Sequence, residues 1–183
     1  AAEINLIDGN TARGTTAIAD GDGVLINDAG TMRQTTVETL KTYIGDNTPA
    51  FAVRKTDGNQ SYSQNTWTKV TFNTELLDTD NAFASNKFTV PTGKAGTYLF
   101  NVMAQMGTIN TGSAYNIKLY VNGSDYVSVV QHATSDAETP IYGGVQAIDL
   151  SVGDYVEVFG ITNGGAGNFT NNLCQFTGFK LGA

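Results

Sequence analysis

The part of the chain from Pro49 to Ala183 alternates apolar and polar residues with the period of two that is typical of β-strands. In the clearest stretch, Tyr98, Phe100, Val102 and Ala104 would share one apolar face. The pattern predicts strands in the ranges 50–55, 67–72, 87–90, 96–105, 115–121, 126–130, 140–150, 155–161 and 173–181. Because no helical periodicity competes here, the sequence predicts an all-β antiparallel sandwich or jelly roll, not a parallel α/β sheet.

Asn122 and Gly123 predict the position of a hairpin. They separate the predicted strands 115–121 and 126–130. A type I′ turn requires positive φ at both central positions, which Asn and Gly tolerate best. We therefore expect these two strands to be antiparallel neighbours.

The first 48 residues are built differently from the rest. Short apolar pieces at 4–7 and 24–26 are separated by Asp-Gly and Gly-Asn pairs, which predicts brief strands joined by turns. Pro49 pushes the residue before it toward extended geometry. We place the domain boundary there, between an N-terminal linking and trimerisation segment, 1–48, and a head domain, 49–183.

One short helix is predicted near the end of the N-terminal segment. Thr35 and Glu38 match the N-cap and N3 positions of a capping box. Apolar residues at helical spacing and a final glycine follow, in the order Val37, Leu40, Tyr43, Ile44 and Gly45. A helix this short is marginal in water unless its apolar stripe is buried, so we expect self-association or packing on the head.

Three motifs of the head resemble those of the C1q-like family. They are Phe88-Thr89-Val90-Pro91 with Gly96-Thr97-Tyr98-Leu99-Phe100, then Leu150-Ser151-Val152-Gly153-Asp154-Tyr155-Val156-Glu157-Val158, and finally Phe176-Thr177-Gly178-Phe179-Lys180-Leu181. The resemblance covers residues 49–183 and implies a ten-strand antiparallel jelly roll of the C1q/TNF type that forms a compact homotrimer. It also implies aromatic packing in the core or around the three-fold axis, for which the candidates are Tyr98, Phe100, Phe176 and Phe179. Collagen-like repeats, which precede such heads in animals, do not occur in this sequence, and this argues against a complement-like role.

Residues 20–31 and the predicted helix have a resemblance of their own. The run Asp20-Gly21-Asp22-Gly23-Val24-Leu25-Ile26-Asn27-Asp28-Ala29-Gly30-Thr31 looks like a segment of virion structural proteins from marine tailed bacteriophages. In those proteins the segment links fibre modules. The resemblance implies a virion setting, with the N-terminal segment contacting other virion proteins.

Composition and charge narrow the possible partners. Ten basic and 17 acidic residues among 183 give a formal charge of −7. Binding to a phosphate backbone depends on clustered Lys and Arg, so we do not expect nucleic acid as a partner. No apolar stretch approaches the roughly 18 residues that span a bilayer, so we expect no membrane insertion. The chain begins Ala1-Ala2, and we expect it to be a piece of a longer protein.

Candidate catalytic chemistry is sparse. His132 is the only histidine and Cys174 the only cysteine, and their spacing leaves a Cys-His pair open. The simpler interpretation is a strand histidine without a catalytic role and a small buried thiol. A glycoside hydrolase needs two carboxylates across a cleft, and no sequence cue selects such a pair. The Gly-rich run 164–167 lacks the Gly-Lys-Ser/Thr of a phosphate loop, so we expect an ordinary loop.

The acidic turn that contains Asp20, Asp22 and Asp28 has the oxygen-rich composition of a calcium site. It lacks the Asp-x-Asp-x-Asp-Gly run and the bidentate glutamate of an EF-hand. We therefore expect turn residues and no cofactor, with Asp20, Asp22 and Asp28 as weak calcium candidates.

The candidates for ligand contacts are aromatic residues and polar loops. Trp67, Tyr62, Tyr126 and Tyr142 are candidates, because Trp and Tyr combine a large apolar area with a polar tip. Polar, glycine-rich loops are predicted at 57–64, 108–113, 135–139 and 163–170.

The leading hypothesis is a non-enzymatic homotrimeric head of a phage tail fibre or virion appendage, exposed on the virion surface and thus extracellular. It would bind a host cell-surface glycan or protein. The alternatives are a structural or decoration module without a ligand, a polysaccharide-degrading fibre tip, and a secreted C1q-like adhesin.

Overall fold

A computed structural model describes residues 17–44, 48–107, 110, 112–133 and 141–182. The chain divides into two compact units, residues 1–45 and 46–183. The predictions for 4–7, Gly45, the loop 135–139 and much of the loop 108–113 lie outside the described residues. None of the described helices is long and apolar enough to cross a membrane.

The N-terminal unit contains a β-hairpin followed by a helix. Strands β1 (Gly23–Asp28) and β2 (Thr31–Thr36) pair antiparallel. Ala29 and Gly30 turn the chain between them, both at positive φ. The turn is fixed because the Gly30 amide donates to Oδ1 of Asn27 at 2.7 Å.

Helix α2 (Val37–Ile44) starts one residue later than predicted. Thr36 caps it, since the Thr36 hydroxyl oxygen accepts a hydrogen bond from the Thr39 amide at 3.2 Å. The prediction of Thr35 as the N-cap is wrong by one residue, because Thr36 directly precedes the first residue of the helix.

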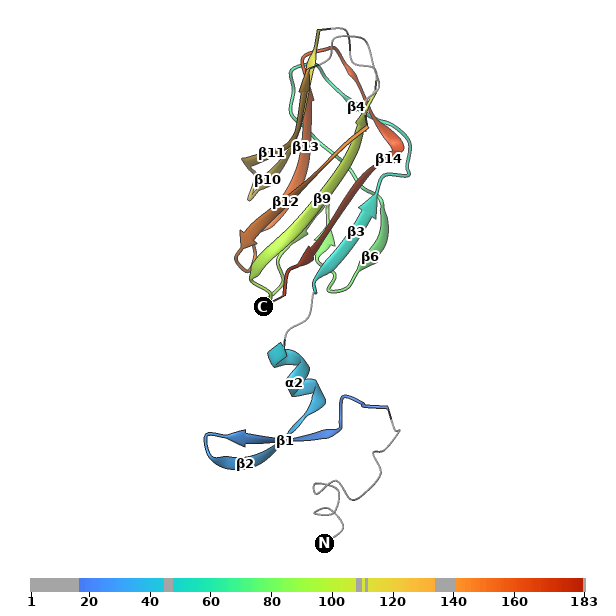
Figure 1. Cartoon of the computed structure of the whole chain (residues 1–183). Helices are drawn as coiled ribbons and strands as arrows, with labels where there is room; N and C mark the ends of the chain where they lie inside the picture. The colour runs from blue at the N-terminus through green and yellow to red at the C-terminus, as the bar shows by residue number, and fades with distance from the viewer. Residues whose placement is uncertain (1–16, 45–47, 108–109, 111, 134–140, 183) are drawn as a thin grey trace. The chain divides into compact units, whose positions relative to one another are not determined.

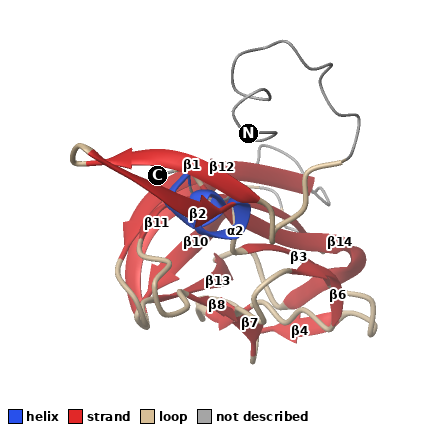
Figure 2. Cartoon of the chain, turned by 90° about the horizontal axis from the view of Figure 1, so that it is seen from below, coloured by secondary structure: helices blue, strands red, loops and turns tan. Residues whose placement is uncertain are grey.

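The head is a sandwich of two antiparallel sheets, each with six strands among the described residues. The first, the β9 sheet, has the order β12 (Ile141–Leu150), β9 (Gly96–Met106), β14 (Gly167–Lys180), β3 (Ala50–Arg54) and β6 (Thr74–Asp78), with β4 (Gln60–Tyr62) also paired to β14. The second, the β10 sheet, has the order β11 (Ser124–Ala133), β10 (Ala114–Val121), β13 (Tyr155–Thr162), β8 (Lys87–Thr89) and β7 (Phe83–Ala84), with β5 (Thr68–Lys69) also paired to β13. Figure 1 shows β9, β14 and β3 side by side, and Figure 2 shows the strands in red.

The described head has twelve strand segments, where the alternation pattern predicts nine and the C1q-like resemblance implies ten. The predicted strand 67–72 forms a ladder only over the two residues of β5. Beyond it, the amides of Thr71 and Phe72 donate to the side-chain oxygens of Gln60 and Asn86. Side-chain acceptors thus satisfy a buried backbone that would otherwise require a neighbouring strand.

The core lies between the two sheets and is rich in phenylalanine. Alternation along β9 is as predicted, with Tyr98, Phe100, Val102 and Ala104 all buried. The ring of Phe176 packs against Phe100 at 5.8 Å and against other aromatic rings of the core. Burial of each such side chain contributes about 1.5–3 kcal/mol.

Three backbone positions require glycine or asparagine. Asn122 and Gly123 have φ of 53° and 75°, which confirms the predicted type I′ hairpin between β10 and β11. At Gly178 a Cβ would lie 2.6 Å from the Phe100 ring and 2.7 Å from the Phe51 ring. Gly178 therefore lets two core phenylalanines pack directly against the backbone of β14.

Candidate functional site

The outer face of the β9 sheet is largely apolar. Its residues form three rows, which read from β12 toward β6 as Ala147–Leu99–Phe179–Ala50, Val145–Asn101–Thr177–Ala52–Leu77 and Gly143–Met103–Gln175–Arg54–Thr74. Val145 is 60% exposed, Leu77 48% and Phe179 39%. We call these three rows the apolar face.

Arg54 is the only charged residue in the apolar face. Its Nε is buried and has no hydrogen-bond partner in the described part of the chain. A buried donor without a partner costs about 1–3 kcal/mol, more when it is charged. The apolar face therefore carries a polar group that the head alone does not satisfy.

The outer face of the β10 sheet is different in composition. Its rows read from β11 as Gln131–Asn116–Ile161, Ser128–Lys118–Phe159–Lys69 and Asp125–Tyr120–Glu157. We call these rows the polar face. Lys69 Nζ lies 2.7 Å from Oε1 of Glu157, and Lys118 forms an ion pair with Asp125. The charges of the polar face are thus paired within the sheet.

Aromatic rings cluster on the polar face. Tyr120 packs on Phe159 with centroids 4.2 Å apart and lies 6.0 Å from Trp67. Lys118 Nζ stands 5.1 Å from the Trp67 ring centroid, within cation–π range. Burial raises the pKa of Tyr120, with a smaller contribution from the Asp125 charge.

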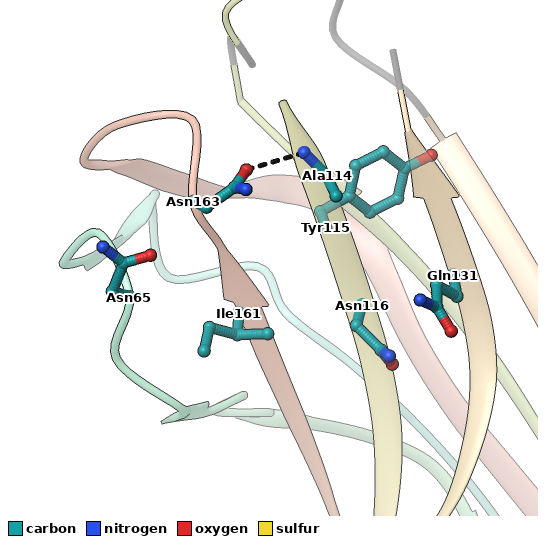
Figure 3. A pocket seen from close by; sticks show the side chains of 7 residues that line it. All are labelled: Asn65, Ala114, Tyr115, Asn116, Gln131, Ile161 and Asn163. Carbon is teal, nitrogen blue, oxygen red and sulfur yellow. Dashed lines mark hydrogen bonds between the residues drawn. The ribbon is translucent and has the colours of Figure 1, made fainter. Parts of the chain in front are cut away.

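A pocket of about 190 Å³ lies at the end of the polar face (Figure 3). Its lining residues are Asn65, Ala114, Tyr115, Asn116, Gln131, Ile161 and Asn163. Oδ1 of Asn163 accepts a hydrogen bond from the Ala114 amide at 2.7 Å, and Nδ2 of Asn116 donates to Ser128 at 3.0 Å. Four side-chain amides and an isoleucine therefore surround a shallow, uncharged hollow.

The four aromatic ligand candidates have four different surroundings. Trp67 is half-buried in the aromatic cluster of the polar face. Tyr62 is buried, and its hydroxyl donates to the Gly107 carbonyl at 2.9 Å. Tyr126 is 53% exposed on β11. Tyr142 packs against Tyr115 at 5.1 Å, next to the ring of His132.

The packing candidates divide between the two sides of one sheet. Tyr98, Phe100 and Phe176 are fully buried inside the sandwich. Phe179 points outward and belongs to the apolar face. Burial raises the pKa of Tyr98 to about 12, with a smaller contribution from Asp80.

The calcium candidates are used in local contacts of the N-terminal unit. Asp20 pairs with Lys41 at 3.0 Å and Asp28 with Arg33 at 2.8 Å. Asp22 accepts a hydrogen bond from the Ala19 amide at 2.8 Å. Among the residues that the structure describes, no three His, Cys, Asp or Glu side chains gather as a metal site would require.

Cys174 and His132 belong to different sheets. Cys174 is buried in the β9 sheet, and burial raises the pKa of its thiol. His132 is on β11, where its ring lies 5.1 Å from that of Tyr142. A buried thiol of raised pKa is a poor nucleophile.

Comparisons with known proteins support the fold. No protein-family model matches the sequence, and no curated protein matches it. The globular domain of zebrafish complement 1qA protein is 25% identical, with a TM-score of 0.48, over 73% of this chain and 97% of that one. Eiger TNF from S. frugiperda is 14% identical, with a TM-score of 0.48, over 72% and 91%. The PRD1 vertex protein P5 is 18% identical, with a TM-score of 0.52, over 75% and 99%.

The two antiparallel sheets of the described head confirm the predicted all-β antiparallel sandwich, and the PRD1 vertex protein P5 has a similar fold. The solved structures that the head resembles include C1q and TNF-type heads.

Sequence reasoning missed the amide pocket. Asn116, Gln131 and Ile161 come from three strands, and Asn65 and Asn163 come from two loops. The outward polar positions of β10 and β11 were readable from alternation alone. That Asn65 lines the same pocket was not, because its position depends on the path of the chain between β4 and β5.

Proposed function

We propose that this chain is the non-enzymatic, homotrimeric head of a virion appendage, such as a phage tail fibre, and that it binds a molecule on the host surface. The observation that carries this proposal is the apolar face. Three rows across five strands expose Val145, Leu77 and Phe179 and include one charge, the incompletely satisfied Arg54.

Identical copies of the head are the proposed occupants of the apolar face. Monomers rarely expose large contiguous apolar patches, and such patches commonly mark protein contacts. Three copies around an axis would remove Val145 and Phe179 from water, at about 25 cal/mol per Å² of apolar surface. They would also offer new acceptors to Arg54 Nε.

Trimerisation explains how a head with shallow pockets can adhere. Three linked copies raise the apparent affinity without any new contact, because the second and third binding events are intramolecular. Weak single-site binding would then be sufficient for attachment to a repetitive surface.

The virion setting is supported by the resemblance of residues 20–44 to linking segments of phage virion proteins. The fold of the head is also found in the PRD1 vertex protein P5. The N-terminal unit would contact other virion proteins. A structural or decoration module has the same trimer but no ligand, and a depolymerase tip would require catalytic residues.

The first experiment measures mass. We expect sedimentation equilibrium to give three times the 19.3 kDa of one chain. A monomer at micromolar concentration would contradict the proposal. The control is Tyr126→Asp, on the opposite sheet, which should still sediment as a trimer.

The second experiment measures adherence. Fluorescently labelled protein is incubated with a panel of marine bacterial isolates, and bound protein is counted by flow cytometry. We expect saturable binding to some isolates and much weaker binding by a Phe179→Asp monomer. Binding to none would favour the structural module, while release of reducing ends from host polysaccharide would favour the enzyme.

A further inference from the structure

The amide pocket and the aromatic cluster form one continuous strip on the polar face. Ile161 lines the pocket, and Phe159 lies two residues earlier on the same side of β13. Residues two apart on a strand are separated by about 6.7 Å. Trp67 directly precedes β5, which pairs with β13, and Asn65 lies in the turn before it. The polar groups of the amide pocket therefore lie next to the rings of the aromatic cluster.

The pocket offers hydrogen-bonding groups that no residue in the described part of the chain uses. The side-chain amides of Asn65 and Gln131 make no hydrogen bond with any described residue. Each primary amide presents two donors and an acceptor. A ligand with hydroxyl groups, which donate and accept together, would match such a lining.

The pocket has no charge to offer. All seven lining residues are uncharged, and the nearest charges of the polar face, Lys118 and Lys69, are paired with Asp125 and Glu157. A charged ligand would lose hydration without gaining a counter-charge, which is costly. The lining therefore favours a neutral ligand.

The size and exposure of the pocket fit one small polar group of a ligand. A volume of about 190 Å³ equals the space of about six water molecules at about 30 Å³ each, less than the pockets that enclose drug-sized ligands. Ile161 provides an apolar floor, and the half-buried Trp67 offers ring surface beside it. One pyranose ring, with hydroxyl edges and apolar C–H faces, fits this description.

The strip stays accessible in the proposed trimer. It lies on the outer face of the β10 sheet, whereas the apolar face is on the other side of the sandwich. Packing of copies through the apolar face would leave one strip exposed on each protomer.

We propose that this strip is a carbohydrate-binding site for a neutral glycan, with one sugar ring in the amide pocket and the chain extending toward Trp67. The inference rests on the proposed function, because it names the ligand class of the adhering head. Gln131 and Asn65 would bind hydroxyl groups, and Ile161 and Trp67 would contact ring C–H groups.

Trp67 provides a direct reporter, since it is the only tryptophan of the chain. Its fluorescence is followed while the full chain is titrated with cello-, malto-, galacto-, manno- and chito-oligosaccharides, and with oligouronates as charged probes. Calorimetry measures the affinity in parallel. We expect a saturable fluorescence change with at least one neutral oligosaccharide and none with the oligouronates.

The variant Gln131→Ala tests the pocket itself. Gln131 is exposed on an edge strand, so its loss should not affect folding. We expect about tenfold weaker binding, equivalent to the loss of one or two hydrogen bonds. The matched control is Gln34→Ala, an exposed amide in the N-terminal unit, which should bind as the wild type does.

Three results would overturn the glycan site: no binding of any neutral oligosaccharide at millimolar concentration, equal binding by Gln131→Ala, or binding of oligouronates alone. If sedimentation still gives a trimer, the proposed function survives and only the ligand assignment fails. A monomeric mass would instead overturn the proposed function.

Discussion

The two outer faces of the head are built on the same alternation and yet differ in chemistry. The rows of the apolar face contain one charge, Arg54, while those of the polar face contain four, all in ion pairs. Both sheets bury apolar side chains on their inner faces. The difference lies only in what each strand presents outward.

This contrast shows that the two faces of one sandwich have different needs for a partner, which is the basis of the proposed division between assembly and recognition. The polar face satisfies its own charges and keeps neutral amides open at one end, so it can remain in water and receive a ligand. The apolar face leaves Val145 and Phe179 in water and Arg54 Nε unbonded, so it gains by being covered. Four changes would test this division.

The largest effect is expected from Phe176→Ala, which leaves a cavity in the core between the two sheets. Phe176 is fully buried and contacts several aromatic rings. The free energy of unfolding should fall by about 3–5 kcal/mol. Urea unfolding measures it. Phe176→Leu keeps most of the volume and should lose less than about 1.5 kcal/mol, and equal losses would contradict tight core packing.

The next effect is expected from Phe179→Asp, which places a carboxylate in the apolar face of each copy. A buried unpaired charge should raise the trimer dissociation constant at least about a hundredfold. Sedimentation at several concentrations measures this change. Tyr126→Asp replaces a more exposed aromatic on the other sheet and should leave the mass unchanged. Dissociation by both variants would erase the distinction between the faces.

A smaller effect concerns alkaline pH. The pKa of Tyr98 is raised to about 12 from 10.0, chiefly by burial, so the folded state favours the protonated phenol. This contribution is complete below about pH 10 and is lost as the pH rises toward 12. The Tyr98 hydroxyl donates a hydrogen bond to the Lys94 carbonyl near the start of β9. We expect ionisation of the phenol to lower the free energy of unfolding by an amount on the order of 1–2 kcal/mol.

The control for this titration is Tyr98→Phe, which has no phenol to ionise. Urea unfolding of both proteins at successive pH values isolates the contribution of Tyr98 from that of the lysines. If the free energy of unfolding falls with pH equally in both proteins, the prediction is contradicted, and the inner face of the β9 sheet admits water.

The smallest effect is expected from Lys118→Ala on the polar face. The substitution removes a cation over the Trp67 ring and an ion pair with Asp125. The free energy of unfolding should fall by about 0.5–1 kcal/mol, and the tryptophan emission should shift. Fluorescence-detected unfolding measures both. Lys41→Ala, which breaks an exposed ion pair in the N-terminal unit, should leave the emission unchanged.

Much of the fold was predictable because local rules and tertiary packing agreed. Alternation located β9, β12 and β13, and Asn122-Gly123 located the hairpin that joins β10 and β11. The loop predicted at 163–170 was partly wrong, since β14 begins at Gly167 and pairs there with β4. Glycine and asparagine suggested a loop, but the partner strand supplied the hydrogen bonds.

The candidate site was less predictable than the fold. Trp67 was identified by residue type, yet Tyr62 belongs to the core and Tyr142 to an aromatic contact between strands. Residue type alone does not distinguish an aromatic side chain in a surface cluster from one beneath a sheet.

The sequence by itself determined which residues face inward, because strand period and side-chain hydrophobicity are properties of each segment. It likewise determined the hairpin turn at Asn122 and Gly123. Only the tertiary structure decided that Leu99 aligns with Phe179 in an apolar row and that Asn65 and Gln131 line one pocket. Register and sheet order set those neighbours, and both depend on contacts between residues far apart in the chain.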